Sequence, residues 1–97
     1  MYKVKFPNVS IEKKFYKELE AIEPKHIQDE ILNEALALAD NPRPKGEPKI
    51  KPPIEIYNFI AQYRLTIENY RVLYDVDDRI KTVWILGIRK RNERTYK

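Results

Sequence analysis

Apolar and lysine side chains alternate over residues 2–6, the period-two pattern of a half-buried β-strand. From Ser10, a suitable helix N-cap, the apolar residues change to helical spacing. A second apolar stripe with the same spacing runs from Pro24 to the proline break at residues 40–42. The pattern predicts a short strand followed by two amphipathic helices that form an αα-hairpin.

Residues 41–53 hold five of the seven prolines, and they predict an extended basic surface loop because proline fits neither a helix interior nor a central strand. Three alternating segments then follow at residues 59–67, 70–76 and 81–88, separated by short polar turns. The last segment is apolar on both faces, as is typical of a central strand.

The predicted order is β-α-α-β-β-β, followed by a basic C-terminal tail. It indicates one α+β domain over residues 1–97, because a chain of this length supports a single core. We expect the helical hairpin to pack on one face of a mainly antiparallel four-stranded sheet, with the other face partly open. No apolar run approaches the ~18 residues of a membrane span, so we expect a soluble cytoplasmic protein.

The formal net charge of +4 is unevenly distributed along the chain. Residues 1–42 carry 6 basic and 8 acidic side chains, whereas residues 43–97 carry 13 and 7. The last nine residues alone have a net charge of +4. The second half of the chain is therefore the part suited to an anionic partner.

Several kinds of chemistry are excluded or disfavoured by composition. The absence of cysteine removes disulfides and thiol nucleophiles, and two glycines cannot supply a phosphate-binding glycine-rich loop. His26 is the single histidine, so no paired-imidazole site is possible, and a solvated helical position suits it. The acidic residues have no metal-binding spacing. We therefore expect neither a metal nor a cofactor.

Basic and aromatic residues remain as candidates for function. Arg64 and Arg71 alternate with core positions on predicted strands, and the tail adds further cations and a tyrosine. Arginine offers planar, bidentate donors to phosphate, and tyrosine can stack on a base. The combination suits RNA or DNA, although strand arginines are often surface residues or salt-bridge partners and basic C-terminal tails are often merely disordered.

The order of motifs resembles the RelE/ParE superfamily of bacterial and archaeal type II toxins. The resemblance rests on Tyr63-Arg64-Leu65 and Tyr70-Arg71-Val72-Leu73-Tyr74 before Asp77-Asp78, on the hydrophobic strand Val83-Trp84-Ile85-Leu86, and on a basic segment closed by a tyrosine. An Asn41-Pro42-Arg43-Pro44 segment after two helices fits as well. The likeness covers nearly the whole chain.

Two activities are implied by this resemblance, and the fold does not choose between them. The RelE branch cleaves messenger RNA in the ribosomal A site, and the ParE branch poisons DNA gyrase. The family's catalytic positions correspond to Arg64, Arg71, Arg91 (or Lys90 if the alignment slips by one) and Tyr96, which favours a metal-independent endoribonuclease. The expected RNA-binding residues are Lys45, Lys49, Lys51, Arg89, Arg94 and Lys97.

In such an enzyme the substrate's 2′-hydroxyl attacks the adjacent phosphorus, and the protein orients the attack and stabilises the added negative charge. Thr66 departs from the family pattern, as does the lack of a tail histidine. The general base therefore stays open among Tyr96, Glu68 and Lys90. A gyrase inhibitor and a catalytically inactive nucleic-acid-binding relative remain alternatives. The resemblance also implies a cognate antitoxin and the mRNA-loaded ribosome as partners.

Overall fold

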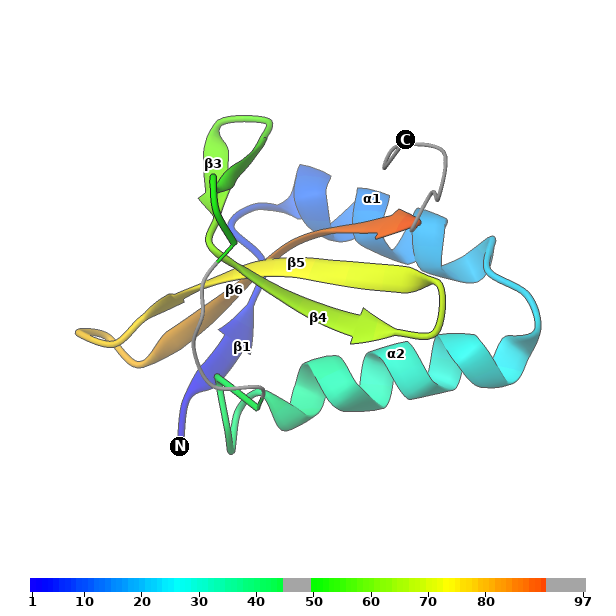
Figure 1. Cartoon of the computed structure of the whole chain (residues 1–97), viewed down its shortest axis with the longest axis horizontal. Helices are drawn as coiled ribbons and strands as arrows, with labels where there is room; N and C mark the ends of the chain where they lie inside the picture. Colours follow the sequence, from blue (N-terminus) through cyan, green and yellow to red (C-terminus); the bar gives the residue numbers. More distant parts are fainter. Residues whose placement is uncertain (45–49, 91–97) are drawn as a thin grey trace.

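The computed structural model describes residues 1–44 and 50–90, which fold into two helices and six strands (Figure 1). In chain order these are β1 (Lys3–Lys5), α1 (Val9–Glu20), α2 (Lys25–Ala37), β2 (Ile54–Ile56), β3 (Phe59–Ala61), β4 (Tyr63–Ile67), β5 (Tyr70–Asp77) and β6 (Thr82–Lys90). Within those residues no helix is long and apolar enough to cross a membrane.

The two helices form the predicted hairpin, and the N-cap of α1 lies two residues before the predicted one. Asn8, not Ser10, is the N-cap, because its side-chain oxygen accepts a hydrogen bond of 2.9 Å from the backbone N–H of Ile11. Pro24 caps α2 with an extended backbone, as predicted from its position at the break. His26 lies exposed on α2, also as predicted.

Four strands form the main sheet in the order β1-β6-β5-β4 (Figure 1). The pairs β4–β5 and β5–β6 are antiparallel hairpins, whereas β1 pairs with β6 in parallel, with Lys3 opposite Thr82. The prediction of a mainly antiparallel four-stranded sheet is confirmed. The last strand, β6, is apolar on both faces because the helices pack on one face, against Val83 and Ile85, and residues of β2 and β3 pack on Leu86 on the other.

One face of this sheet carries the main core. Phe15 and Leu19 of α1 and Ile31 of α2 are buried against it. The sheet contributes alternate residues of its strands, except for a step of three between Ile85 and Ile88, where the pairing of β5 and β6 shifts by one residue. These residues are Tyr63, Leu65, Ile67, Val72, Tyr74, Val83, Ile85 and Ile88. We call the opposite side the open face; it carries Arg64, Arg71, Leu73 and their neighbours in register.

A second, two-stranded sheet was not predicted. The expected strand over residues 59–67 is interrupted at Gln62, and its first part pairs with β2 as a small antiparallel hairpin. Ile56 and Ala61 of this hairpin are buried against Leu73 and Leu86 on the open face. The prediction of one strand was wrong because Ala61 and Tyr63 are both buried but in different apolar clusters. The hairpin covers the middle of the open face and leaves its two ends accessible.

Candidate nucleic-acid interface

Three arginines lie on the open face, at the end of the sheet beyond the β2–β3 hairpin. Arg71 on β5 stands directly opposite Thr66 on β4 and Arg89 on β6, and Arg64 is one row away, opposite Leu73. Side chains directly opposite in an antiparallel pair have Cβ atoms about 4.5–5.5 Å apart, and like charges there repel. We call Arg64, Arg71 and Arg89 the arginine cluster; a bound anion would relieve its repulsion.

A β-bulge in β6 determines whether Arg89 or Lys90 lies on the same face as Arg71. Leu73 pairs with Gly87 but Tyr74 pairs with Ile85, so Leu86 is an extra residue in β6. One inserted residue exchanges the faces of all later positions. Arg89 therefore lies on the open face, whereas Lys90 stands opposite Tyr70 on the helix side. The structure does not bring Lys90 together with Arg64 and Arg71; Arg89, predicted as an RNA-binding residue, lies opposite Arg71 instead.

The members of the cluster differ in burial. Arg71 is partly buried, while Arg64 and Arg89 are exposed. Arg89 Nη1 donates a hydrogen bond of 3.3 Å to the backbone oxygen of Ile88, which leaves most of its guanidinium donors facing solvent. Within residues 1–44 and 50–90, neither Arg64 nor Arg89 takes part in an ion pair. The cluster thus consists of two exposed arginines, Arg64 and Arg89, and of the partly buried Arg71.

Several of the expected site residues lie outside the described part of the chain. These are Lys45, Lys49, Arg91, Arg94, Tyr96 and Lys97. Lys51 is described and exposed in the segment before β2. Glu68, one of the three candidate bases, is the first residue of the β4–β5 turn, where its φ is 53°. Its position is that of a turn residue.

An ion-paired network at the opposite end of the sheet was missed by the sequence prediction. Arg43, in the loop after α2, donates from Nη1 and Nη2 to the two carboxylate oxygens of Asp78 at 3.2 and 2.7 Å. Its Nε donates to the hydroxyl oxygen of Tyr63 at 3.1 Å, and the Tyr2 hydroxyl donates to Asp78. The hydrogen bond to Asp78, followed by that to Tyr63, raises the pKa of Arg43. Arg43 is therefore a permanently charged clamp.

A buried tyrosine secures the same loop. The Tyr74 hydroxyl donates a hydrogen bond of 2.9 Å to the backbone oxygen of Pro42, and its ring stacks on Tyr63 with centroids 5.6 Å apart. Residues that alternate along β4 and β5 therefore have different roles. Tyr63 and Tyr74 face the core and hold the loop after α2, whereas Arg64 and Arg71 lie on the open face. The proline–arginine segment and the paired aspartates were the only sequence indications of this clamp.

Comparisons with known proteins agree on the family and the fold. Residues 9–95 match the family model described as the ParE toxin of the type II toxin–antitoxin system, parDE. Among solved structures, the archaeal RelE–RelB complex from Pyrococcus horikoshii OT3 contains a similar chain, with a TM-score of 0.69 and 25% sequence identity. The alignment covers 95% of this chain and 97% of that one. A search of curated proteins gives no significant match. The chain therefore belongs to the ParE toxin family of type II toxin–antitoxin systems, within the RelE/ParE superfamily, and has the fold of RelE.

Proposed function

We propose that this toxin is a ribosome-dependent endoribonuclease that cleaves messenger RNA without a metal. The observation that carries the proposal is the arginine cluster: Arg71 and Arg89 are directly opposite on β5 and β6, and Arg64 is one row away on the same face. Three guanidinium groups at such spacing suit a phosphate that gains negative charge during the reaction.

The substrate supplies the nucleophile in this mechanism. The 2′-hydroxyl oxygen bonds to the adjacent phosphorus and loses its proton, and the bond to the 5′-oxygen breaks. The products are a 2′,3′-cyclic phosphate and a 5′-hydroxyl, which receives a proton as it leaves. The arginines stabilise the phosphorane at about 3 kcal/mol each but cannot accept the proton, since arginine stays charged.

Proton transfer is assigned to the tail, with Tyr96 as the base and Arg91 as a further phosphate donor. Lys90 is the weaker candidate because its strand position faces away from the cluster. A site with three arginines and no candidate base beside them in register would be slow on free RNA. The ribosome would then complete it by holding the scissile bond in line for attack.

The test is growth arrest on expression, together with primer extension to map cleavage of messenger RNA in the A site. Arg71→Ala and Arg91→Ala should each lower cleavage about 10²-fold or more. Arg79→Ala is the matched control, because Arg79 is exposed in the β5–β6 turn and its loss changes the net charge equally. Unchanged toxicity in both site variants would show that the site assignment is wrong.

A second candidate is a gyrase inhibitor, which the parDE description of the matching family model favours. This function predicts loss of DNA supercoiling and a DNA-damage response, with intact messenger RNA. Supercoiling of a plasmid by purified gyrase, with and without the toxin, separates the two. Harmless overexpression would instead indicate an inactive nucleic-acid-binding relative.

A cognate antitoxin completes the proposed system, as RelB accompanies RelE in the archaeal complex. A net charge of +4 favours an acidic partner and fast association at low salt. Co-expression of the neighbouring gene should relieve growth arrest. We place the toxin and its antitoxin in the cytoplasm, where the ribosome is.

A further inference from the structure

The outer edge of β4 is a strand edge to which another chain could add. β4 is the last strand of the main sheet, and among residues 1–44 and 50–90 no strand pairs with its outer side. Natural sheets blunt such edges with very short strands, lysine, proline or a bulge, because unpaired backbone groups there recruit other chains. β4 runs for five residues with no proline, lysine or bulge, and its one charged residue is Arg64.

The other edge of the sheet, at β1, is blunted. β1 has only three residues, and two of them, Lys3 and Lys5, are lysines. Tyr2, just before β1, donates its backbone N–H to the oxygen of Ala39 at 2.8 Å, so the segment after α2 occupies part of this edge. Of the two edges, β4 is therefore the better one for an extended peptide.

The register of the β4–β5 hairpin shows which backbone groups face outward. A two-residue turn, residues 68–69, joins the strands, and Ile67 pairs with Tyr70 at its base. In an antiparallel pair, alternate residues exchange both backbone hydrogen bonds with their partner, and the residues between them direct theirs to the other side. Counted back from Ile67, the N–H and C=O groups of Thr66 and Arg64 therefore point away from β5.

One hydrogen bond agrees with this assignment. The backbone oxygen of Gln62, two residues before Arg64, accepts from the backbone N–H of Ile50 at 2.8 Å. The chain thus already pairs with the outer side of the sheet at the next outward-facing residue. Thr66 and Arg64 continue this row at intervals of two residues, about 6.6–6.8 Å. A second extended backbone matches the row, because it alternates donors and acceptors at the same interval.

The two sides of this edge differ in chemistry. On the open face, Arg64 and Thr66 are exposed, and Arg71 stands opposite Thr66. On the helix side, a hollow of about 120 Å³ lies where the end of α2 meets β4, lined by Glu34, Ala37, Leu38, Asn41, Pro44 and Leu65. Side chains of an added strand would alternate between the two sides. Acidic side chains suit the arginines, and an apolar side chain suits the hollow, most of whose lining residues are apolar.

We propose that the cognate antitoxin adds an extended segment to the outer edge of β4, with acidic side chains toward the arginine cluster and an apolar side chain in the hollow. The inference rests on the proposed function, to which the antitoxin and the role of the arginines belong. A residue opposite Arg64 on the added strand has its Cβ about 4.5–5.5 Å away. A carboxylate there would take the guanidinium donors that the substrate phosphate needs, which explains inhibition.

A second copy of the toxin suits this edge less well. Pairing of β4 with its own copy would place two arginine clusters in one continuous sheet, where like charges at such short range repel. RNA is also a poor occupant of the edge, because its phosphates are acceptors and leave the outward C=O groups of Arg64 and Thr66 without donors.

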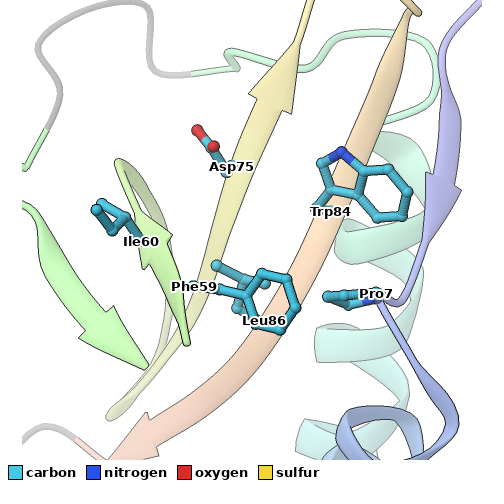
Figure 2. A pocket seen from close by; sticks show the side chains of 6 residues that line it. All are labelled: Pro7, Phe59, Ile60, Asp75, Trp84 and Leu86. Atoms are coloured by element: carbon cyan, nitrogen blue, oxygen red, sulfur yellow. The ribbon is translucent and has the colours of Figure 1, made fainter. Parts of the chain in front are cut away.

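A second hollow, on the open face beside the β2–β3 hairpin, is the main competing place for the antitoxin. It has a volume of about 230 Å³ and is lined by Pro7, Phe59, Ile60, Asp75, Trp84 and Leu86 (Figure 2). The Asp75 carboxylate in it already accepts a hydrogen bond from Gln62 Nε2 at 3.3 Å. Trp84 is the only tryptophan of the chain, so its indole N–H peak in a ¹H–¹⁵N spectrum reports whether this hollow is filled.

Amide hydrogen exchange of the full chain, alone and saturated with the antitoxin encoded by the neighbouring gene, tests the inference. In the free toxin the N–H groups of Arg64 and Thr66 should exchange rapidly, whereas that of Leu65, which pairs with Val72, should be protected. Antitoxin binding should slow exchange at Arg64 and Thr66 by about tenfold or more. Movement of the Trp84 peak without protection of these two amides would place the antitoxin in the hairpin hollow and overturn the inference.

A substitution at Thr66 tests the same contact by affinity. Thr66→Pro removes an outward N–H and spares the β4–β5 ladder, because proline is tolerated on an edge strand where the N–H faces away. It should weaken antitoxin binding about tenfold or more, whereas the control Thr66→Val keeps the N–H and should bind like the unmodified toxin. The exchange measurement on the unmodified chain decides the question if Thr66→Pro does not fold.

The remaining outcomes separate this inference from its alternatives. Fast exchange at Arg64 and Thr66 in the saturated complex, or protection of both in the free toxin, would overturn it. Protection that rises with the concentration of toxin alone would show self-pairing and overturn it as well. Primer extension is read independently: protection of the edge without cleavage of messenger RNA would refute the ribonuclease alone, and cleavage without protection would refute the edge alone.

Discussion

The Tyr74 hydroxyl offers a clean test of what fixes the loop after α2 to the sheet. Tyr74 is 2% exposed, and its hydroxyl donates to the backbone oxygen of Pro42 at 2.9 Å. Tyr74→Phe keeps the ring and its stacking on Tyr63, so it creates no cavity. The substitution removes the hydrogen bond to Pro42, and this bond contributes about 1–2 kcal/mol.

Urea unfolding followed by circular dichroism measures this change, with an unaltered slope because the buried area is the same. The melting temperature should fall by about 4–8 °C for each kcal/mol in a domain of this size. Tyr70→Phe is the matched control: no described residue hydrogen-bonds to the Tyr70 hydroxyl, and the change should stay within about 0.5 kcal/mol. Equal stability of the two variants would refute the role of the hydroxyl.

Three further experiments test other parts of the fold. Alanine at Arg43, at Asp78 and at both should give a double-mutant coupling of about 1 kcal/mol that shrinks with added salt, since the two side chains are 26% and 57% exposed. Gly87→Ala should be neutral or stabilise by up to about 1 kcal/mol, because its Cβ would meet Ile56 Cδ1 at an ordinary 3.7 Å; a loss above 1 kcal/mol would contradict this. Leu86→Ala should destabilise by about 2–5 kcal/mol in the same unfolding assay, and a loss below 1 kcal/mol would mean that the hairpin does not depend on its cluster.

The sequence predicted the fold correctly in each segment whose regularly spaced apolar residues all pack in the same cluster. The helical stripes and the alternation of β5 met this condition, and the order of elements along the chain was predicted from them. Residues 59–67 did not, because alternation continues through Gln62 although the buried side chains on its two sides enter different clusters. Periodicity shows that a side chain is buried but not which cluster it joins.

The candidate site was predicted in part for a related reason. Arg64 and Arg71 were found because they alternate with core residues on regular strands. Lys90 was named as a candidate catalytic residue from the family resemblance, and Arg89 only as an RNA-binding residue. The apolar pattern could not show that Arg89 lies beside Arg71, because a bulge at Leu86 leaves no trace in it. The Arg43 clamp was missed since its loop contains little except prolines and charges, which describe a surface segment equally well.

The parallel pairing of β1 with β6 has a consequence for synthesis of the toxin. Lys3 pairs with Thr82, so a strand made at the start of translation waits for one of the last segments to emerge. The helices, too, lack the sheet face that buries Phe15 and Ile31 until residues 63–88 are present. All three members of the arginine cluster lie on these late strands. Such long-range contacts delay folding until nearly the whole chain has been made. A toxin built in this order cannot present its arginine cluster while most of its chain is still being translated.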